Sequence, residues 1–397
     1  MKKIWLIPIF FVLLLTGVFI SRKQTVKVPS LNNPQASIKP SANSYQISSG
    51  SVPSIPFSLP SGYTIHIFAS NLTNPRDMIF TPNGTLLVSS PKENEVYALP
   101  DKNQDGVADQ NIVIISGENH PHGLAFYNTH LFVADVDRVV RYTWNDSTLS
   151  ASKDKNLFSL PENNDHNNRT ILFDKNGNLF VSVGSTCNVC HESSPFSATV
   201  LKSNENGDSP TIFATGLRNA AFLALNPTTG EIWATGMGRD YLGDNLPPDE
   251  INILMSNQNY GWPYCYGNRI HDNNFDPRNT HSCSSTTAPI YEIPAHSAPL
   301  GLTFINSSQF PSDEQGDLLV AYHGDWNRST PIGFKIVHLR VNGNNISGSD
   351  DFLTGFLQSS NASDALGRPA DMIFDSKGNL YISDDKAGNI YIVQKKG

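Results

Sequence analysis

One pattern recurs six times along the chain: an alternation of apolar and polar residues, a turn that usually contains Gly or Asn, and a second alternation. Alternation on both sides of such a turn is typical of a β-hairpin. A further strand-like run follows most copies, for example NEVYALP and GNIYIV. The copies are DMIFTPNGTLLVS from 77, GLAFYNTHLFVAD from 123, TILFDKNGNLFVS from 170, FLALNPTTGEIWATG from 222, GLTFINSSQFPSDEQGDLLVAY from 301 and DMIFDSKGNLYISD from 371.

The spacing of these hairpins predicts a propeller. Successive copies start 46, 47, 52, 79 and 70 residues apart, which describes repeated sheets of three or four strands. The body shows no long amphipathic helical window, which disfavours an α/β fold. We therefore predict an all-β, six-bladed β-propeller over residues 59–397, in which YTIHIFASNL (63–72) closes the ring by pairing with the last blade. The two long spacings indicate insertions at 237–298 and 305–328, where function is expected.

The N-terminus indicates export. Residues 1–20 combine two lysines with a nearly continuous apolar run, which is typical of an export signal or of a short membrane anchor over 4–20. Residues 21–58 are rich in Ser, Pro, Asn and Gln without periodic apolar spacing, so we expect a flexible linker. The expected location of the body is periplasmic or extracellular, with membrane contact only through the N-terminal segment.

Charge and cysteine content narrow the function further. The chain has 36 acidic and 28 basic residues, for a net charge of -8, so nucleic acid is not an expected partner. Four cysteines in an exported chain favour disulfides. Cys265 and Cys283 flank a polar loop that a bridge would staple, whereas Cys187 and Cys190 form CNVC. This short motif favours a local structural bridge, with a redox or zinc half-motif as the alternative.

The connection before the first strand of each blade should reach the mouth of the central channel. Polar residues at such places are commonly turn formers or solvated loop residues, but here all six connections carry Arg, His or Asp. A partly desolvated imidazole such as His166 would take a proton from a substrate hydroxyl near neutral pH. No G-x-S-x-G nucleophile motif is present, which disfavours nucleophilic hydrolysis. These positions are Arg76, Asp77, His120, His122, Asp165, His166, Arg218, Asn219, His296, Arg368 and Asp371.

Several short motifs together carry a family resemblance. Their order and spacing resemble those of the pyrroloquinoline quinone (PQQ) dependent soluble glucose dehydrogenases and, more closely, of the sorbosone dehydrogenase-like branch of that superfamily. The resemblance covers roughly residues 60–395, which is nearly the whole body. The motifs are NDH at 164–166, GLRN at 216–219, DEIN at 249–252, NYGWP at 259–263, HGDWNRS at 323–329 and GRPADMIF at 367–374.

The resemblance implies roles for individual residues. His166 matches the family's general base, and Asp165 matches the acid beside it that contacts the substrate. Arg218 and Asn219 match residues that hold the carboxylates and carbonyls of PQQ, and Arg368 matches a second cofactor arginine. These residue types suit the cofactor, because guanidinium groups bind carboxylates bidentately.

The resemblance also implies two calcium ions. Backbone carbonyls at Gly238 and Arg239 would hold one ion against the quinone, and calcium prefers such oxygen ligands. A second, structural ion is implied by Asp249, Glu250 and the backbone of Tyr260. The alternative is that the segment PPDE is simply a solvated turn.

The chain departs from the family pattern at four places. Arg239 replaces the proline of the family's calcium-binding Gly-Pro pair, although only its carbonyl is needed. Ser185 stands where the family has the carboxylate that orients the histidine, so the histidine is expected to be a weaker base or to be oriented by another group. A glutamine expected before the second hairpin is missing, which leaves His122 or His120 to face the ligand. The lysine of blade five is not obvious, and Arg328 or His323 would substitute for it. The serine and the CNVC that follows are typical of the sorbosone-like branch.

The sequence thus predicts an exported dehydrogenase that uses PQQ and calcium to oxidise a sugar or a sugar-derived aldehyde. His166 would remove the proton of the anomeric hydroxyl or aldehyde hydrate while hydride passes to the quinone, and electrons would leave to a membrane quinone or another redox carrier. One alternative is a calcium-dependent lactonase, which needs several acidic side chains on the axis. Another is a propeller that only binds glycans or protein, which Ser185 would allow.

Overall fold

The computed structural model describes residues 55–162 and 165–396. The predicted signal or anchor over 1–20, and nearly all of the predicted linker, lie outside these residues. Within the described part, no helix is long and apolar enough to cross a membrane. Helical structure in that part consists of the 3-10 turns η1 (Pro91–Glu93), η2 (Ser312–Glu314) and η3 (Ala362–Asp364).

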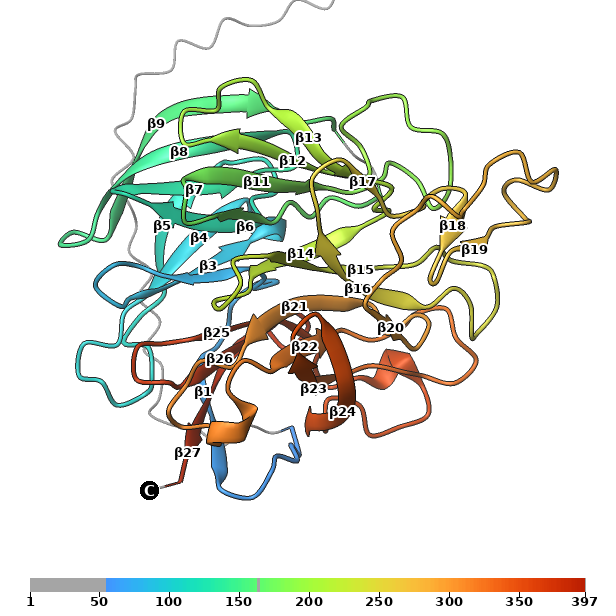
Figure 1. Cartoon of the computed structure of the whole chain (residues 1–397). Coiled ribbons are helices and arrows are strands. Elements are labelled where there is room, and N and C mark those ends of the chain that lie inside the picture. The colour runs from blue at the N-terminus through green and yellow to red at the C-terminus, as the bar shows by residue number, and fades with distance from the viewer. Residues whose placement is uncertain (1–54, 163–164, 397) are drawn as a thin grey trace, which may run out of the picture. The chain divides into compact units, whose positions relative to one another are not determined.

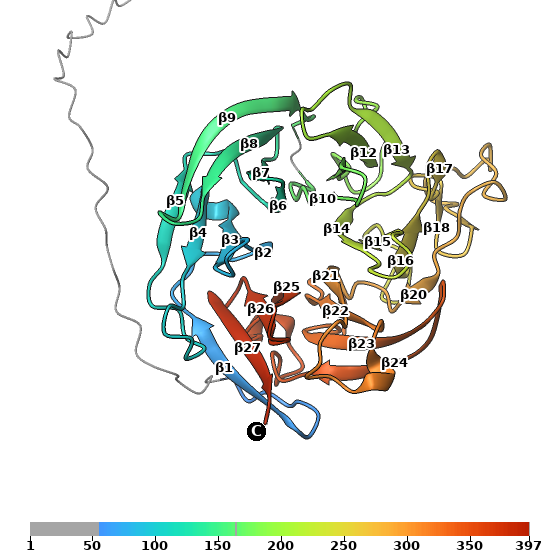
Figure 2. The same cartoon turned by 60° about the vertical axis from the view of Figure 1, so that its left-hand side comes forward.

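Six sheets of four or five strands stand around one axis, so the predicted six-bladed β-propeller is confirmed (Figure 1). Figure 2 shows the first strand of each blade nearest the centre of the ring. Each predicted hairpin forms the first two strands of one blade. Blades 1 to 3 contain β2 (Met78–Phe80), β3 (Leu86–Ser90), β4 (Glu95–Leu99) and β5 (Ile112–Ser116); β6 (Gly123–Tyr127), β7 (His130–Ala134), β8 (Arg138–Asn145) and β9 (Ser150–Ser159); and β10 (Ile171–Phe173), β11 (Asn178–Val183), β12 (Thr199–Asn204), β13 (Thr211–Thr215) and β17 (Gln258–Asn259).

The remaining three blades follow the same order from the axis to the rim. The predicted closure of the ring is confirmed, because β1 pairs antiparallel with β27, with Tyr63 opposite Lys395. Blades 4 to 6 contain β14 (Ala220–Leu225), β15 (Ile232–Gly236), β16 (Asp249–Leu254) and β20 (Tyr291–Ile293); β21 (Pro299–Phe304), β22 (Leu318–Tyr322), β23 (Lys335–Asn342) and β24 (Asn345–Leu353); and β25 (Pro369–Phe374), β26 (Leu380–Asp384), β27 (Asn389–Lys395) and β1 (Tyr63–Ala69).

The hairpin turns follow from their residues. In blade 3, Asp174 Oδ1 accepts hydrogen bonds from the backbone N–H groups of Asn176 and Asn178, both at 2.9 Å. Gly177 adopts a φ of +77°, a left-handed conformation that costs glycine little. The side chain therefore folds the backbone into the turn that its sequence predicts.

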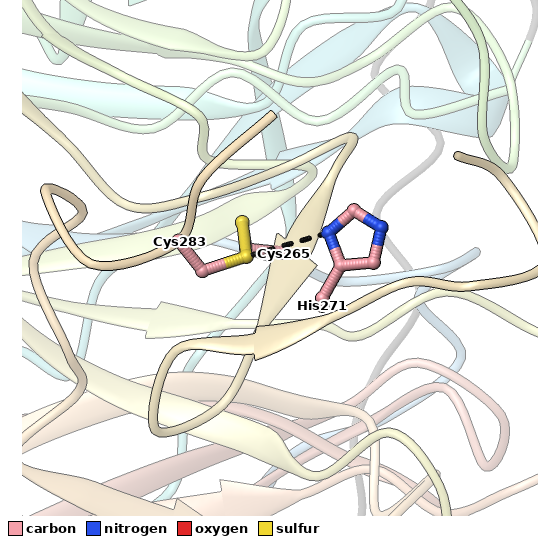
Figure 3. Close-up of side chains that lie close together, drawn as sticks. All are labelled: Cys265, His271 and Cys283. Carbon is pink, nitrogen blue, oxygen red and sulfur yellow. Dashed lines mark hydrogen bonds between the residues drawn. A yellow bond between two sulfur atoms is a disulfide. The ribbon is translucent and has the colours of Figure 1, made fainter. Parts of the chain in front are cut away.

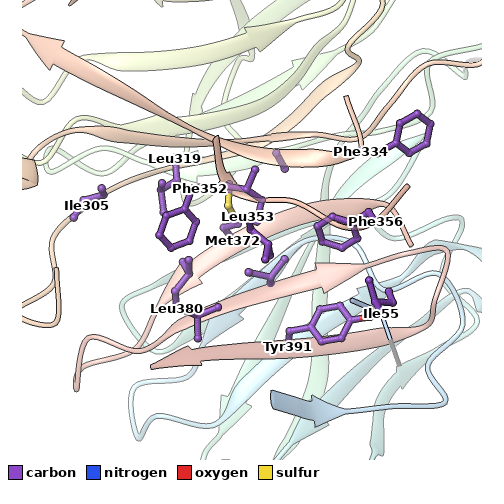
Figure 4. Close-up of a cluster of buried hydrophobic side chains, with 14 of the residues drawn as sticks. Ile55, Ile305, Leu319, Phe334, Phe352, Leu353, Phe356, Met372, Leu380 and Tyr391 are labelled. Atoms are coloured by element: carbon purple, nitrogen blue, oxygen red, sulfur yellow. The ribbon is translucent and has the colours of Figure 1, made fainter. Parts of the chain in front are cut away.

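The core is divided into apolar layers between neighbouring blades. Figure 4 shows the layer between blades 5 and 6, where Leu319 and Phe352 of one blade pack against Met372, Leu380 and Tyr391 of the next. All five side chains are buried. Burial of each such side chain contributes about 1.5–3 kcal/mol to the stability of the fold. The apolar layers therefore hold neighbouring blades together.

Polar side chains near the axis add direct bonds between blades. Asp77 Oδ2 accepts from the backbone N–H of Leu124 at 2.7 Å, and Asp371 Oδ2 accepts from that of Met78 at 2.9 Å. Burial raises the pKa of both carboxyl groups, that of Asp371 to about 7. These two aspartates, which the sequence places at the channel mouth, therefore join blades to each other.

The long insertion of blade 4 carries most of the irregular structure. It contains the small sheet of β18 (Cys265–Tyr266) and β19 (Ile270–His271), and its β17 joins blade 3 in parallel with β13. The predicted bridge between Cys265 and Cys283 is present, with His271 Nδ1 3.8 Å from the Cys283 sulfur (Figure 3). Because the two sulfurs are bonded to each other, they are not thiolate ligands for a metal.

The CNVC motif also forms its predicted local bridge, between Cys187 and Cys190. Its sulfurs are consumed by the disulfide, so the zinc half-motif alternative does not hold in this structure. Among the described residues no cysteine is free.

Candidate active site

The loops before the first strands of all six blades meet at one cavity of about 550 Å³. The sequence-predicted residues that line it come from every blade, so the six connections do converge. They are Arg76, His120, Asp165, His166, Arg218, Asn219, His296 and Arg368.

His166 is held in one orientation by Ser185. Its Nδ1 lies 3.0 Å from the Ser185 carbonyl oxygen and 2.9 Å from the Ser185 hydroxyl oxygen. That hydroxyl donates to the Cys187 carbonyl at 2.7 Å, so both Ser185 oxygens act as acceptors toward the ring. In the neutral imidazole Nδ1 therefore carries the proton and Nε2 is the acceptor nitrogen, which is the tautomer that a general base requires.

The surroundings of His166 favour its neutral form. Burial, followed by the nearby Arg218 guanidinium, lowers the pKa of the imidazole to about 4, while the Asp165 carboxylate acts in the opposite direction. Gly184 makes room for the ring, because a Cβ on this residue would lie 2.5 Å from the His166 Cβ. The imidazole is thus available as a proton acceptor at neutral pH.

Arg218 is fixed by a loop that sequence reasoning did not connect with the site. Its Nε donates to the Asn188 carbonyl at 2.9 Å and its Nη2 donates to the Asn188 side-chain oxygen at 3.0 Å. Nη2 also pairs with Asp240 at 3.1 Å. Asn188 belongs to CNVC, so the bridge between Cys187 and Cys190 closes the loop that positions this guanidinium. No spacing in the sequence indicates a contact across these 30 residues.

Arg368 is fixed by blade 5. Its Nε donates to the His323 carbonyl at 3.1 Å and its Nη2 donates to the carbonyls of Gly324 and Asp325. The guanidinium also lies over the Phe334 ring, 5.1 Å from its centroid. Both predicted cofactor arginines are therefore held rigidly before any ligand binds.

A charged group beside the cavity was also missed. Asp385 accepts from Arg76 Nη1 at 2.6 Å and lies 3.0 Å from His323 Nε2. His323 and Arg76 hold the pKa of the Asp385 carboxyl well below its usual range, against the effect of burial. Asp385 thereby orients two residues that face the ligand cavity or its edge.

The structure separates the residues that the sequence offers as alternatives. His120 lines the cavity, whereas His122 is fully buried against Phe222, with ring centroids 5.2 Å apart. His323 lines the cavity, whereas Arg328 lies in an adjoining groove and donates to the Ala295 carbonyl at 3.1 Å. The expectation of ligand contact thus moves from His122 and Arg328 to His120 and His323, because the first pair is turned away from the cavity.

The ligands implied for the second, structural calcium ion fall into two places rather than one. Asp249 lines the main cavity, where its two oxygens accept from the backbone N–H groups of Gly238 and Ala298, both at 2.9 Å. Glu250 and Tyr260 line a separate small cavity of about 30 Å³. Adjacent residues of a strand point to opposite faces. One ion bound by both Asp249 and Glu250 side chains, as expected above, is therefore incompatible with this geometry.

Each place keeps some features that suit a cation. Burial raises the pKa of Asp249 to about 7 and that of Glu250 to about 7, so each carboxylate lacks full charge compensation. The Gly238 carbonyl, an implied ligand, faces the main cavity but accepts from Arg218 Nη1 at 2.8 Å. The Arg239 side chain points elsewhere and pairs with Asp272 at 2.7 Å, which leaves only its carbonyl as a candidate ligand.

The donors of the main cavity suit an anionic organic ligand. Three guanidinium groups and several imidazoles face a space that is large enough for a cofactor. The axis of the six-bladed ring thus brings these guanidinium groups together with His166, next to the carboxylates of Asp165, Asp240, Asp249 and Asp325.

Comparison with known proteins identifies the family. A family model described as TrAA12-like matches residues 57–396. An uncharacterized protein of Borreliella burgdorferi is 31% identical over 354 residues, covering 84% of this chain and 90% of that protein. A pyrroloquinoline quinone-dependent sugar dehydrogenase of Hypocrea jecorina is 25% identical over 393 residues, covering 84% of this chain and 88% of that protein.

The solved structures agree in fold. The calcium structure of Trichoderma reesei carbohydrate-active enzymes family AA12 matches with a TM-score of 0.77 at 22% identity, over 86% of this chain and 98% of that chain. The chain belongs to the TrAA12-like family. The resemblance to PQQ-dependent sugar dehydrogenases that the motifs indicate is thereby confirmed at the level of the family.

Proposed function

We propose that this chain is a PQQ-dependent sugar dehydrogenase, an oxidoreductase that oxidises the anomeric hydroxyl of an aldose or the hydrate of a sugar aldehyde. Its family and its relative named a PQQ-dependent sugar dehydrogenase support the class of enzyme and cofactor. The observation that carries the proposal is the convergence of His166, Arg218 and Arg368 on one cavity of about 550 Å³.

The residues of the cavity fit PQQ, which carries three carboxylates. Backbone carbonyls already hold the guanidinium groups of Arg218 and Arg368 in place. These side chains therefore lose little conformational entropy when a ligand binds. Arg76 adds a third guanidinium, and Asn219 offers an amide for a carbonyl oxygen. When bound, PQQ supplies a two-electron acceptor for the hydride of the substrate.

The chain's own residues would handle the proton. His166 Nε2 takes the proton of the substrate hydroxyl, because Ser185 keeps the other ring proton on Nδ1. The imidazolium formed in this step is stabilised by Asp165, which raises the pKa of the ring. Ser185 contributes orientation but no charge, so this base is weaker than one backed by a carboxylate.

Calcium is part of the proposal. The Gly238 carbonyl and the Asp249 carboxylate supply oxygen donors at the main cavity, and Glu250 with the Tyr260 backbone supplies a second set at the small cavity. A cation at either place would offset a buried negative charge. We assign the first set to the catalytic ion and the second to a structural ion.

Export is also part of the proposal. Two disulfides persist most readily in an oxidising compartment, which supports a periplasmic or extracellular body. Electrons would then pass from the reduced cofactor to a membrane quinone or to a redox carrier outside the cytoplasm.

Dye reduction tests the proposal. Purified protein is mixed with PQQ and calcium, and reduction of an acceptor dye is measured with aldoses and with sorbosone. We expect turnover that needs both PQQ and a sugar, and a loss of at least 100-fold in His166→Ala. His66→Ala on the outer strand β1 serves as the matched control. Turnover that is equal in His166→Ala would refute the assignment of the base.

The same protein distinguishes the two alternatives. Hydrolysis of lactones without PQQ would indicate a lactonase. Binding on a glycan array, with no PQQ binding and no dye reduction on any sugar, would indicate a propeller that only recognises glycans.

A further inference from the structure

A second hollow opens beside the catalytic cavity. It has a volume of about 880 Å³ and shares His323, Asp325, Trp326 and Arg368 with the wall of the first cavity. The two spaces therefore lie side by side, with these four residues between them. Hydroxyl and amide side chains provide much of the remaining lining, namely Asn74, Ser329, Ser360, Asn361 and Ser363.

Trp326 stands exposed where the two spaces meet. Its exposed fraction is 65%, which is unusual for a residue type that is mostly buried. Tyr241, on the blade 4 insertion, is 70% exposed and lies edge-on to it, with ring centroids 6.1 Å apart and planes at 85°. Two large rings at the rim of an otherwise polar hollow form an exposed aromatic site, and such sites commonly bind a partner.

The loop holds Trp326 in this exposed position. Asp325, which precedes it, accepts from the backbone N–H of Ile332 at 2.7 Å. Asn327, which follows it, donates to Asp240 Oδ1 at 2.7 Å. Because both neighbours are held by hydrogen bonds, the backbone at Trp326 is already ordered. Little conformational entropy of this loop is therefore lost when a ligand binds.

The chemistry of the hollow matches a chain of sugar rings. One face of a pyranose ring presents C–H groups that pack on an indole, while its hydroxyls need donors and acceptors at the edge. A flat aromatic beside amides and hydroxyls provides both kinds of contact. An isolated monosaccharide bound in the catalytic cavity would leave this second hollow unused.

We propose that the adjoining hollow is a subsite for oligosaccharides, in which Trp326 stacks against the ring that follows the reducing sugar. This inference rests on the proposed function, since the reducing sugar itself would lie beside His166. The preferred substrate is then the reducing end of an oligosaccharide rather than a free monosaccharide.

Steady-state kinetics on the holoenzyme test the subsite. The probes are reducing sugars of one to four units from the malto-, cello-, xylo- and oligogalacturonic series. We expect kcat/KM to rise at least tenfold from one unit to three in at least one series, mainly through KM. Trp326→Ala should remove most of that rise, and Trp326→Phe should restore part of it. Val113→Ala, which alters an exposed apolar side chain on β5, is the control.

Three outcomes decide the matter. If kcat/KM is flat or falls with chain length in every series, the subsite does not exist. If Trp326→Ala weakens PQQ binding and lowers activity on one unit and on three units equally, the indole contacts the cofactor and the proposal is wrong. If no sugar is oxidised at all, the proposed function fails, and calorimetric binding of the same oligosaccharides to wild type and Trp326→Ala still decides whether the subsite exists.

Discussion

The most informative single residue of the site is Ser185. Its carbonyl and hydroxyl oxygens both accept from His166 Nδ1, so neutral groups orient the ring at the position where the resemblance implies a carboxylate. A neutral partner fixes the tautomer but does not attract the positive charge of an imidazolium. The substitution therefore separates the positioning of the base from its strength.

This separation predicts the pH dependence of the enzyme. Because burial and Arg218 lower the pKa of His166 to about 4, the acid limb of kcat/KM should lie well below pH 6.5. Ser185→Asp should move that limb upward by at least about one pH unit, since an opposite charge raises the pKa of the imidazole. Ser185→Ala, as the control, should lower kcat without moving the limb upward. Superimposable profiles for wild type and Ser185→Asp would contradict this role of Ser185.

Gly184 provides a second prediction for a single residue. A methyl group at this position would lie 2.5 Å from the His166 Cβ, so Gly184→Ala should displace the imidazole. A displacement of about 1 Å is expected to lower kcat/KM by about 100-fold. Thermal unfolding, measured on the same variant, separates this local displacement from a general loss of stability. Wild-type kcat/KM in Gly184→Ala would show that the ring tolerates the shift.

Among the elements, the two disulfide loops have different tasks. The bridge between Cys187 and Cys190 closes a loop whose Asn188 holds Arg218, whereas the bridge between Cys265 and Cys283 closes a longer loop at the rim. The first therefore acts on the ligand site and the second on stability.

Paired serine variants test this difference. Replacing both Cys187 and Cys190 should weaken PQQ binding by about tenfold or more, since Arg218 loses its support, with little change in Tm. Replacing both Cys265 and Cys283 should lower the free energy of unfolding by about 3 kcal/mol with unchanged PQQ affinity. Calorimetry and urea denaturation measure the two quantities. The reverse pattern would exclude a role of the CNVC loop in binding.

Strand β1 is the element that closes the ring, and its most buried large side chain is Phe68. This side chain is 2% exposed and packs edge-on against Tyr381, with ring centroids 4.9 Å apart. Phe68→Ala should lower the free energy of unfolding by about 3–5 kcal/mol. Thr64→Ala on the same strand should cost less than about 1 kcal/mol. Equal denaturation midpoints for the two variants would mean that β1 contributes little to closure.

At the scale of the whole molecule, stability should depend on pH and on calcium together. Burial raises the pKa of Asp249 and of Glu250 to about 7, above their values in an unfolded chain. A carboxyl group with a raised pKa stabilises the fold at low pH and loses that contribution as pH rises through about 7. Without calcium, Tm should therefore fall between pH 5 and pH 8, and calcium should restore it at the upper end.

Differential scanning calorimetry with and without a chelator measures this dependence. Glu250→Gln removes the carboxylate of the small cavity and should reduce the calcium-dependent rise in Tm, whereas Glu231→Gln on an exposed turn should not. A Tm that does not respond to calcium at any pH would remove the structural ion from the proposal.

The sequence predicted the ring because its information is local. Each hairpin is determined by apolar alternation and by a turn such as that of Asp174 and Gly177. Six such patterns therefore predict six blades. The convergence of His166, Arg218 and Arg368 then follows from the symmetry of the ring. Both disulfides could also be anticipated, because each lies within one loop.

The remaining features depend on how irregular loops fold. Asn188 meets Arg218 and Asp385 meets Arg76 only because segments that are far apart in the sequence come together in the fold. The side chains of Asp249 and Glu250 point to opposite faces because both residues belong to one strand. The sequence alone does not show that the strand includes both. Motif spacing alone could not indicate these contacts.

A ring formed by a linear chain must be closed where segments from its two ends pair, and here the closing pair is β1 with β27. Elsewhere the continuous chain connects each blade to the next. Between blades 3 and 4, the parallel pairing of β17 with β13 adds a second connection. Force applied to the two chain ends would therefore act first on the β1–β27 pairing. Mechanical unfolding of the propeller should begin there rather than beside the ligand cavity.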